Sequence, residues 1–316
     1  MPQQNHKKRV LELNRAQGNS FVAEVNVPRL MSLKFADMTA DFNPLVRRGV
    51  VPGFYIDSVV ASAFEDAVAG SRVHPPIVSI SSKFIKYFMA GEPVKFAFSP
   101  SRLTSAELQT VKEGKQVCSV KIGYGEPVQS HTSPESFGGM QGLIEYSFSE
   151  ADVENFRRMT GAIPKARHLV PMLALSYFSS AAEMALPKNK GYAEPAVRFS
   201  EAGPLEVWGY TLGSKKQDGE PAQDDLERIS AIAGECFEKG GIVYTSHTVT
   251  FFQGAYQLVP SERFMIYIDY SGLRPLKSED GKNIVGVRGS VKGEAVLSNN
   301  ERIFECSAGV YARSDW

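Results

Sequence analysis

The sequence has no excess charge of either sign. Its 35 lysines and arginines balance 35 aspartates and glutamates, and neither sign gathers in a long run. A protein dedicated to DNA or RNA usually carries a basic patch or stripe. The composition therefore gives no reason to expect a nucleic-acid partner.

Long apolar runs are also missing. No stretch approaches the roughly 18 apolar residues that a membrane-spanning helix needs, and no apolar signal-peptide core follows the polar, basic residues 1–9. We therefore expect a cytoplasmic protein with no membrane partner.

Cysteine is scarce, and the common cofactor motifs are absent. Cys118, Cys236 and Cys306 are an odd number without Cys-x-x-Cys spacing, which indicates neither a disulfide framework nor a zinc knuckle. Glycine-rich phosphate loops, Gly-x-Ser-x-Gly and metal-ligand spacings of His, Cys, Asp or Glu do not occur either. We expect no cofactor and no metal.

Two apolar helices are present, and 316 residues are enough for two cores. Apolar residues recur at helical spacing over residues 51–68 and again over residues 169–186. Both segments have small residues in the middle, which allow a curved sheet to pack closely around each helix. A shorter helix over residues 149–159 opens with a capping box at Ser149 and Asp152.

The remaining patterned segments predict strands rich in β-branched and aromatic residues. Residues 35–48 look like a turn-rich connection, and residues 224–239 like a further helix. The predicted strands cover residues 21–27, 77–87, 94–100, 116–123, 242–252, 263–270, 285–297 and 302–312.

These elements divide the chain into two halves. Residues 1–18 are expected to be a flexible leader, residues 19–129 the first half, and the Ser-, Pro- and Gly-rich residues 130–142 a linker. The second half, residues 143–316, contains an insertion near residues 200–240.

Three pairs of matching segments indicate that the halves repeat. Phe-x-x-Met-Thr occurs at residues 35–39 and 156–160. Val-Pro precedes or opens each apolar helix, and Ile-Val starts a strand at residues 77 and 242. The same order of matches in both halves favours a duplication.

A resemblance to a known family enters at residues 39–46, Thr-Ala-Asp-Phe-Asn-Pro-Leu-Val. This segment resembles the MaoC-like hydratase motif Thr-Gly-Asp-x-Asn-Pro-Leu-His, in which Asp and His act together on the α-proton and the β-hydroxyl of an acyl thioester. Asp41 and Asn43 match the motif, and Val46 stands where its His is expected.

The second half is similar to the lead-in of the same motif over residues 148–161, but it continues with Ala-Ile-Pro in place of Asp-x-Asn-Pro. His168 follows where the family has a His-Gly turn. Residues 49–57, Gly-Val-Val-Pro-Gly-Phe-Tyr-Ile-Asp, are also similar to the helix start of acyl-carrier-protein dehydratases, where an acid in the first turns is catalytic. Asp57 lies one position before that acid, and Ser58 occupies its place.

A strand, a turn-rich loop, one buried helix and several long strands follow the order of the hot-dog fold. The resemblance therefore implies an α+β tandem (double) hot-dog, each half a curved antiparallel sheet around a central helix. It also implies a dehydratase or hydratase, a lyase of fatty acid or polyketide metabolism, that acts on an acyl thioester of coenzyme A or acyl carrier protein.

Because hot-dog pockets lie between partners, one site can take residues from both halves. The expected catalytic residues are Asp57, His168 and Asp41, since a His and a semi-buried carboxylate suit proton transfer. The expected substrate-binding residues are Asn43, Gly53, Tyr55 and Met172. Peptide N–H groups at a helix start near Gly53 or Met172 suit the thioester oxygen.

Structural alternatives stand beside these roles. Asp57 can serve only the helix dipole, Asp41 and Asn43 can simply form a turn, and Tyr55 can be a core residue. His74 and His247 rank lower as site residues.

Two other functions also stay open, an acyl thioesterase and a non-catalytic hot-dog that binds an acyl chain or a partner protein. A fused pair is compatible with a monomer or with a homodimer.

Overall fold

The computed structural model describes residues 10–41, 43–69, 75–132, 142–164, 166–185, 198–200, 203–205, 241–277 and 284–313. Four expectations lie outside these ranges: most of the linker, the helix over residues 224–239, nearly all of the insertion, and His74. Cys236 also lies outside them.

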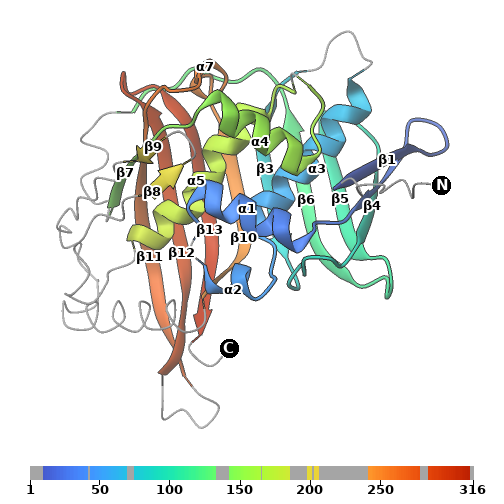
Figure 1. The fold of residues 1–316 in the computed structure, drawn as a ribbon, viewed down its shortest axis with the longest axis horizontal. Helices are drawn as coiled ribbons and strands as arrows, with labels where there is room; N and C mark the ends of the chain where they lie inside the picture. The colour runs from blue at the N-terminus through green and yellow to red at the C-terminus, as the bar shows by residue number, and fades with distance from the viewer. Residues whose placement is uncertain are drawn as a thin grey trace, which may run out of the picture.

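The described strands form one large antiparallel sheet (Figure 1). The first half contributes six strands, in the spatial order β1 (Leu11–Arg15), β2 (Phe21–Val25), β4 (Val94–Phe98), β5 (Leu103–Thr110), β6 (Gln116–Tyr124) and β3 (Ile77–Phe84). The second half continues with β10 (Ile242–Phe251), β13 (Arg302–Arg313), β12 (Ile284–Leu297), β11 (Phe264–Lys277) and β7 (Gly142–Tyr146). A separate two-stranded piece pairs β8 (Arg198–Ser200) with β9 (Gly203–Leu205).

The strands of the two halves are arranged symmetrically on either side of the central β3–β10 pair. Outward from this pair, β6, β5, β4 and β2 follow on one side, and β13, β12, β11 and β7 follow on the other. The corresponding strands occur in the same sequence order in both halves. This arrangement is a pair of hot-dog units joined edge to edge, which confirms the predicted α+β tandem.

Helices cover one face of the sheet, in front of it in Figure 1. The central helices are α3 (Gly53–Val68) and α5 (Leu169–Ala185), as predicted from their apolar spacing. The small side chains in their middles, Ala61, Ala63, Ala181 and Ala182, are fully buried. None of the described helices combines the length and the apolar content that crossing a bilayer requires.

The shorter helices are α1 (Arg29–Thr39), α2 (Pro44–Arg47), α4 (Glu150–Thr160) and α7 (Gly254–Gln257). In the matched helices α1 and α4, the last threonine donates a hydrogen bond to the Phe carbonyl four residues before, at 2.9 Å in both. A left-handed residue, Ala40 or Gly161, ends each helix. The repeated Phe-x-x-Met-Thr sequence therefore has one local structure.

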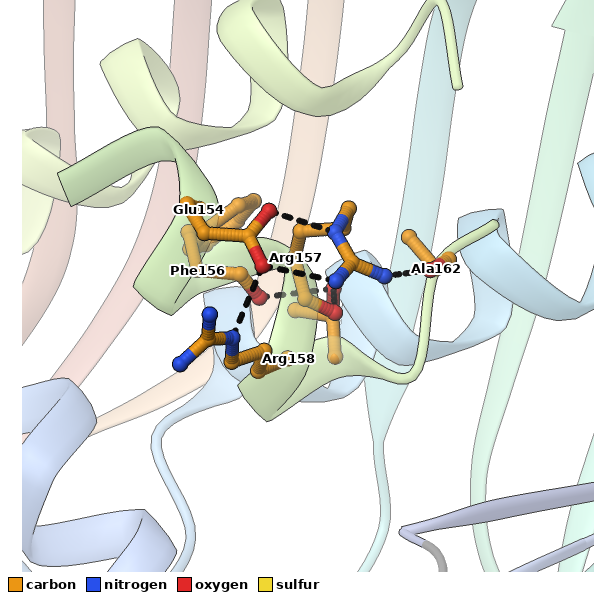
Figure 2. A network of polar contacts seen from close by, with 6 residues as sticks. Glu154, Phe156, Arg157, Arg158 and Ala162 are labelled. Atoms are coloured by element: carbon orange, nitrogen blue, oxygen red, sulfur yellow. Dashed lines mark hydrogen bonds and ion pairs between the residues drawn. The ribbon is translucent and has the colours of Figure 1, made fainter. Parts of the chain in front are cut away.

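Helix α4 begins and is braced as its sequence indicates. Ser149 and Asp152 form the expected capping box. Figure 2 shows Glu154 accepting two 2.7 Å hydrogen bonds from Arg157 and another from Arg158. These bonds lower the pKa of Glu154 to about 2.

The structure departs from the sequence predictions in several places. Leu11–Arg15, assigned above to a flexible leader, forms strand β1 and pairs with β2. Part of the segment expected to be turn-rich, residues 35–48, belongs to helices α1 and α2. Strands β5, β7, β8 and β9 and the short helix α7 were not predicted.

Candidate active site

A buried histidine–aspartate pair joins the two halves. His247 Nδ1 of strand β10 lies 3.0 Å from Asp57 Oδ2 of helix α3. Ser82 of strand β3 donates a 2.5 Å hydrogen bond to the other oxygen, Oδ1. Both His247 and Asp57 are 0% exposed. Because Asp57 belongs to the first half and His247 to the second, neither half contains this pair alone.

The second ring nitrogen of His247, Nε2, makes no hydrogen bond to the described residues. Buried polar atoms of side chains are nearly always hydrogen-bonded in folded proteins, so an open buried nitrogen needs an explanation. Proton exchange with a bound molecule is one.

Aromatic rings fix the plane of the His247 imidazole. Phe54 stacks on it with ring centres 3.9 Å apart and planes 4° apart, and Phe84 meets it edge-on at 4.9 Å. The first turn of α3 also lies against the ring, since a Cβ placed on Gly53 would be 2.7 Å from His247 Cε1. The predicted site residue Gly53 is therefore at the pair.

The pair lies at the seam between the halves, where β3 pairs with β10. Ser82 and His247 are directly opposite in the β3–β10 register, and each is the sixth residue of its strand. They therefore face each other across the seam between the halves, one with a hydroxyl and the other with an imidazole.

The central helices differ in the same place. Both carry the spacing Ser-x-x-x-Ser-x-x-Glu, ending at Glu65 in α3 and at Glu183 in α5. With the helices aligned on it, Leu175 takes the position of Asp57. Helix α5 therefore has no acid at the position equivalent to Asp57.

His168 lies elsewhere, so the structure does not bring it into hydrogen-bond contact with Asp57. Its Nε2 is 3.0 Å from Ser62 Oγ, and its Nδ1 is 2.9 Å from Glu65 Oε2 without being aligned for a hydrogen bond. Glu65 also accepts the backbone N–H groups of Arg167 and His168. This cluster connects the last turns of α3 to the start of α5.

Asp41 and Asn43 form a buried turn between the halves. Asp41 accepts the backbone N–H of Asn43 at 3.0 Å, and Ser179 Oγ of α5 lies 3.4 Å from its other oxygen. The Asn43 amide bonds both the carbonyl and the N–H of Ile242, at the start of β10. These contacts attach the motif of the first half to the second half.

The other two predicted binding residues are enclosed. Tyr55 is 0% exposed and donates a 2.7 Å hydrogen bond to the carbonyl of Met159. Met172 is also buried, and its N–H already donates to the carbonyl of His168. That N–H is therefore not available for a thioester oxygen, whereas Gly53 and Phe54 begin α3 behind Pro52, which provides no side-chain cap.

Replacing Tyr55 with Phe is expected to lower the free energy of unfolding by about 1–1.5 kcal/mol, because the Met159 carbonyl loses its buried donor. Turnover per folded molecule should be unchanged. Denaturant unfolding and a kinetic assay measure the two quantities. Lost turnover at unchanged stability would instead place the hydroxyl at the substrate.

The buried thiols beside the pair are not nucleophiles. Burial raises the pKa of Cys118 and Cys306, and the charge of Asp57 raises both further. Because the thiolate is the reactive form, both stay unreactive near neutral pH. Among the residues that the structure describes, no three His, Cys, Asp or Glu side chains are grouped so that they could hold a metal ion.

Sequence reasoning ranked His247 low because it is an isolated histidine on a strand. No local pattern marks it, because its contact with Asp57 depends on the pairing of β3 with β10.

No family model and no curated protein matches the chain. Among solved structures, it is similar to an acyl-CoA thioesterase II, TesB2, of Mycobacterium marinum (12% identity, 96% of each chain, TM-score 0.44). It is also similar to a MaoC-like dehydratase (11%, 96% of this chain and 97% of that one, 0.47). A third is the dehydratase domain of the polyketide protein PpsC of Mycobacterium tuberculosis (11%, 95% and 96%, 0.45). The reaction of this chain therefore has to follow from its own residues.

Proposed function

We propose that the chain adds or removes water at the β-position of an acyl thioester, with His247 as its acid and base and Asp57 as the carboxylate that positions His247. The observation that carries this proposal is the buried pair itself. Its members come from different halves, and His247 Nε2 has no partner among the described residues.

The contact with Asp57 assigns the proton of His247. A carboxylate beside Nδ1 favours the tautomer that carries its proton there, so Nε2 keeps a lone pair and acts as the base. Ser82 occupies the second carboxylate oxygen and keeps Asp57 oriented. Asp57 is then a positioning residue in this reaction, and His247 is the group that exchanges protons with the substrate.

In the dehydration direction, His247 Nε2 takes the α-proton, and the electrons of the C–H bond form the α,β double bond. The β-carbon–oxygen bond breaks, and the departing hydroxyl receives the proton from His247 as water. The products are an enoyl thioester and water, and hydration is the reverse. One histidine can carry out both transfers if the α-hydrogen and the β-hydroxyl lie on the same side.

The first turn of α3 supports the thioester carbonyl in this scheme. The imidazole lies against Gly53, so the free N–H groups that begin the helix are near the base. Negative charge that develops on the thioester oxygen during α-proton removal is stabilised by such donors and by the helix dipole. Substrate access requires movement of Phe84, the half-buried ring at the edge of the imidazole.

Thioester hydrolysis is the second candidate, because the same Nε2 can activate a water molecule for attack on the carbonyl. The products then differ, since hydrolysis releases a free thiol and a carboxylic acid.

Incubation with crotonyl, 3-hydroxybutyryl and longer acyl thioesters, on coenzyme A and on acyl carrier protein, tests the proposal by mass spectrometry. We expect a change of about 18 mass units, the mass of water, that forms at least about 10²-fold more slowly in Asp57→Asn. Free thiol would support the thioesterase instead. No turnover of any substrate would favour a binding protein without chemistry.

A further inference from the structure

A cavity of about 370 Å³ lies on the outer face of the second half, within the range of small-molecule pockets, roughly 300–1,000 Å³. Side chains alternate along a strand. Since Val287 is buried in the core, its neighbour Arg288 points to the opposite face, as does Tyr311, the register partner of Arg288. The cavity is lined by Thr245, Arg274, Arg288, Gly289, Val310 and Tyr311.

Two arginines face each other in this cavity. Arg274 of β11 and Arg288 of β12 are direct partners in the antiparallel register, and both are exposed. Like charges directly opposite on neighbouring strands destabilise a sheet. No carboxylate of the described residues forms an ion pair with either one. An anion between them would remove the repulsion.

The other lining groups suit an anion that accepts several hydrogen bonds. Tyr311 of β13 is the register partner of Arg288 on its other side, and Thr245 adds a second hydroxyl. Gly289 contributes no side chain, which leaves space next to Arg288. Guanidinium groups bind phosphate through two parallel hydrogen bonds, and no carboxylate lines the cavity that would attract a cation instead.

A bulge in β10 links the cavity to the histidine–aspartate pair. Thr245 and His247 are two residues apart, so a regular strand would place both on one face. The register shifts between Tyr244 and Ser246, and the burial pattern changes phase there, with Thr245 exposed and His247 buried. One irregularity therefore turns His247 toward Asp57 and Thr245 toward the arginines. Bulges that re-aim side chains are common beside functional sites.

We propose that this cavity binds a phosphoryl anion, a phosphate or diphosphate group held between Arg274 and Arg288 with Thr245 and Tyr311 as further donors. This proposal does not depend on the proposed reaction, because anion binding can be measured whether or not the protein turns over a thioester.

Titration calorimetry of the full chain with inorganic pyrophosphate tests this proposal. We expect saturable binding that weakens at least about tenfold when Arg274 and Arg288 are both replaced by Gln. Arg263→Gln is the matched control. It removes one exposed arginine from the position just before β11, roughly 35 Å along the chain from Arg274, and should leave binding unchanged. Absent binding to the wild type, or equal binding to the wild type and the double variant, would overturn the proposal.

A second titration determines which kind of molecule carries the bound phosphoryl group. Adenosine 3′,5′-bisphosphate is titrated against the wild type, with and without saturating coenzyme A. Competition would support the site and assign it to the phosphates of the thioester carrier. Simultaneous binding of both at this cavity, lost in the double variant, would support it as a site for a separate phosphorylated ligand. Bisphosphate binding that both arginine replacements leave intact would contradict it.

Discussion

Replacing His247 with Gln, or Asp57 with Asn, is expected to lower kcat/KM for the acyl thioester by about 10²–10⁴-fold. Glutamine has no lone-pair nitrogen to act as the base. Asparagine can turn its N–H toward Nδ1 and stabilise the wrong tautomer of His247. Steady-state kinetics with the thioester identified by mass spectrometry measure both effects.

His168→Gln is the control for this prediction, because His168 touches Ser62 and Glu65 rather than Asp57. The variant should unfold at lower denaturant concentration, since Glu65 loses a buried neighbour, but it should keep its turnover per folded molecule. Full activity in Asp57→Asn, with activity lost in His168→Gln, would move the chemistry to the His168 cluster.

Gly53→Ala is expected to reduce both turnover and stability, although Ala is favoured over Gly by about 1 kcal/mol in an ordinary helix. The new Cβ would lie 2.7 Å from His247 Cε1 and 3.1 Å from Phe84 Cζ. The imidazole must therefore shift. A displacement near 1 Å can cost about 10²-fold in rate, and overpacking typically costs about 1–3 kcal/mol of stability.

Gly125→Ala is the matched control for this clash. Its Cβ would meet the Val78 side chain at ordinary contact distances, 3.5 Å from Cγ2 and 3.9 Å from Cγ1, so stability and turnover should change little. Thermal unfolding and kinetics of the two variants, measured side by side, separate a local clash from a general effect of removing glycine. Unchanged activity in Gly53→Ala would show that His247 needs no fixed position.

The central helices and most strands could be predicted from periodicity because their apolar residues repeat at helix or strand spacing. Helix α1 could not, since Pro28 at its start provides no side-chain cap, whereas its counterpart α4 opens with a capping box. Strand β5 was missed because Leu103–Thr110 has no aromatic residue and no Val or Ile, and its only β-branched residues are two threonines. Its alternating burial is set by β4 and β6 on either side.

The residues of the candidate site could likewise be predicted only where they belong to a local pattern. Asp57 and Gly53 were found because both belong to a local pattern at the start of one helix. His247 comes 190 residues after Asp57, and their contact depends on the pairing of β3 with β10 and on the bulge beside Tyr244. Such long-range registers leave little trace in a single sequence. His168 fitted the same reasoning by residue type, but the structure places it with Glu65.

A double-mutant cycle on Asp57 and His247 tests the central claim most directly. If the two side chains act as one acid–base unit, kcat/KM of the Asp57→Asn/His247→Gln double variant will be no lower than that of the more impaired single variant, within about threefold. Losses that multiply across the two positions would show independent roles, and would contradict a single composite centre.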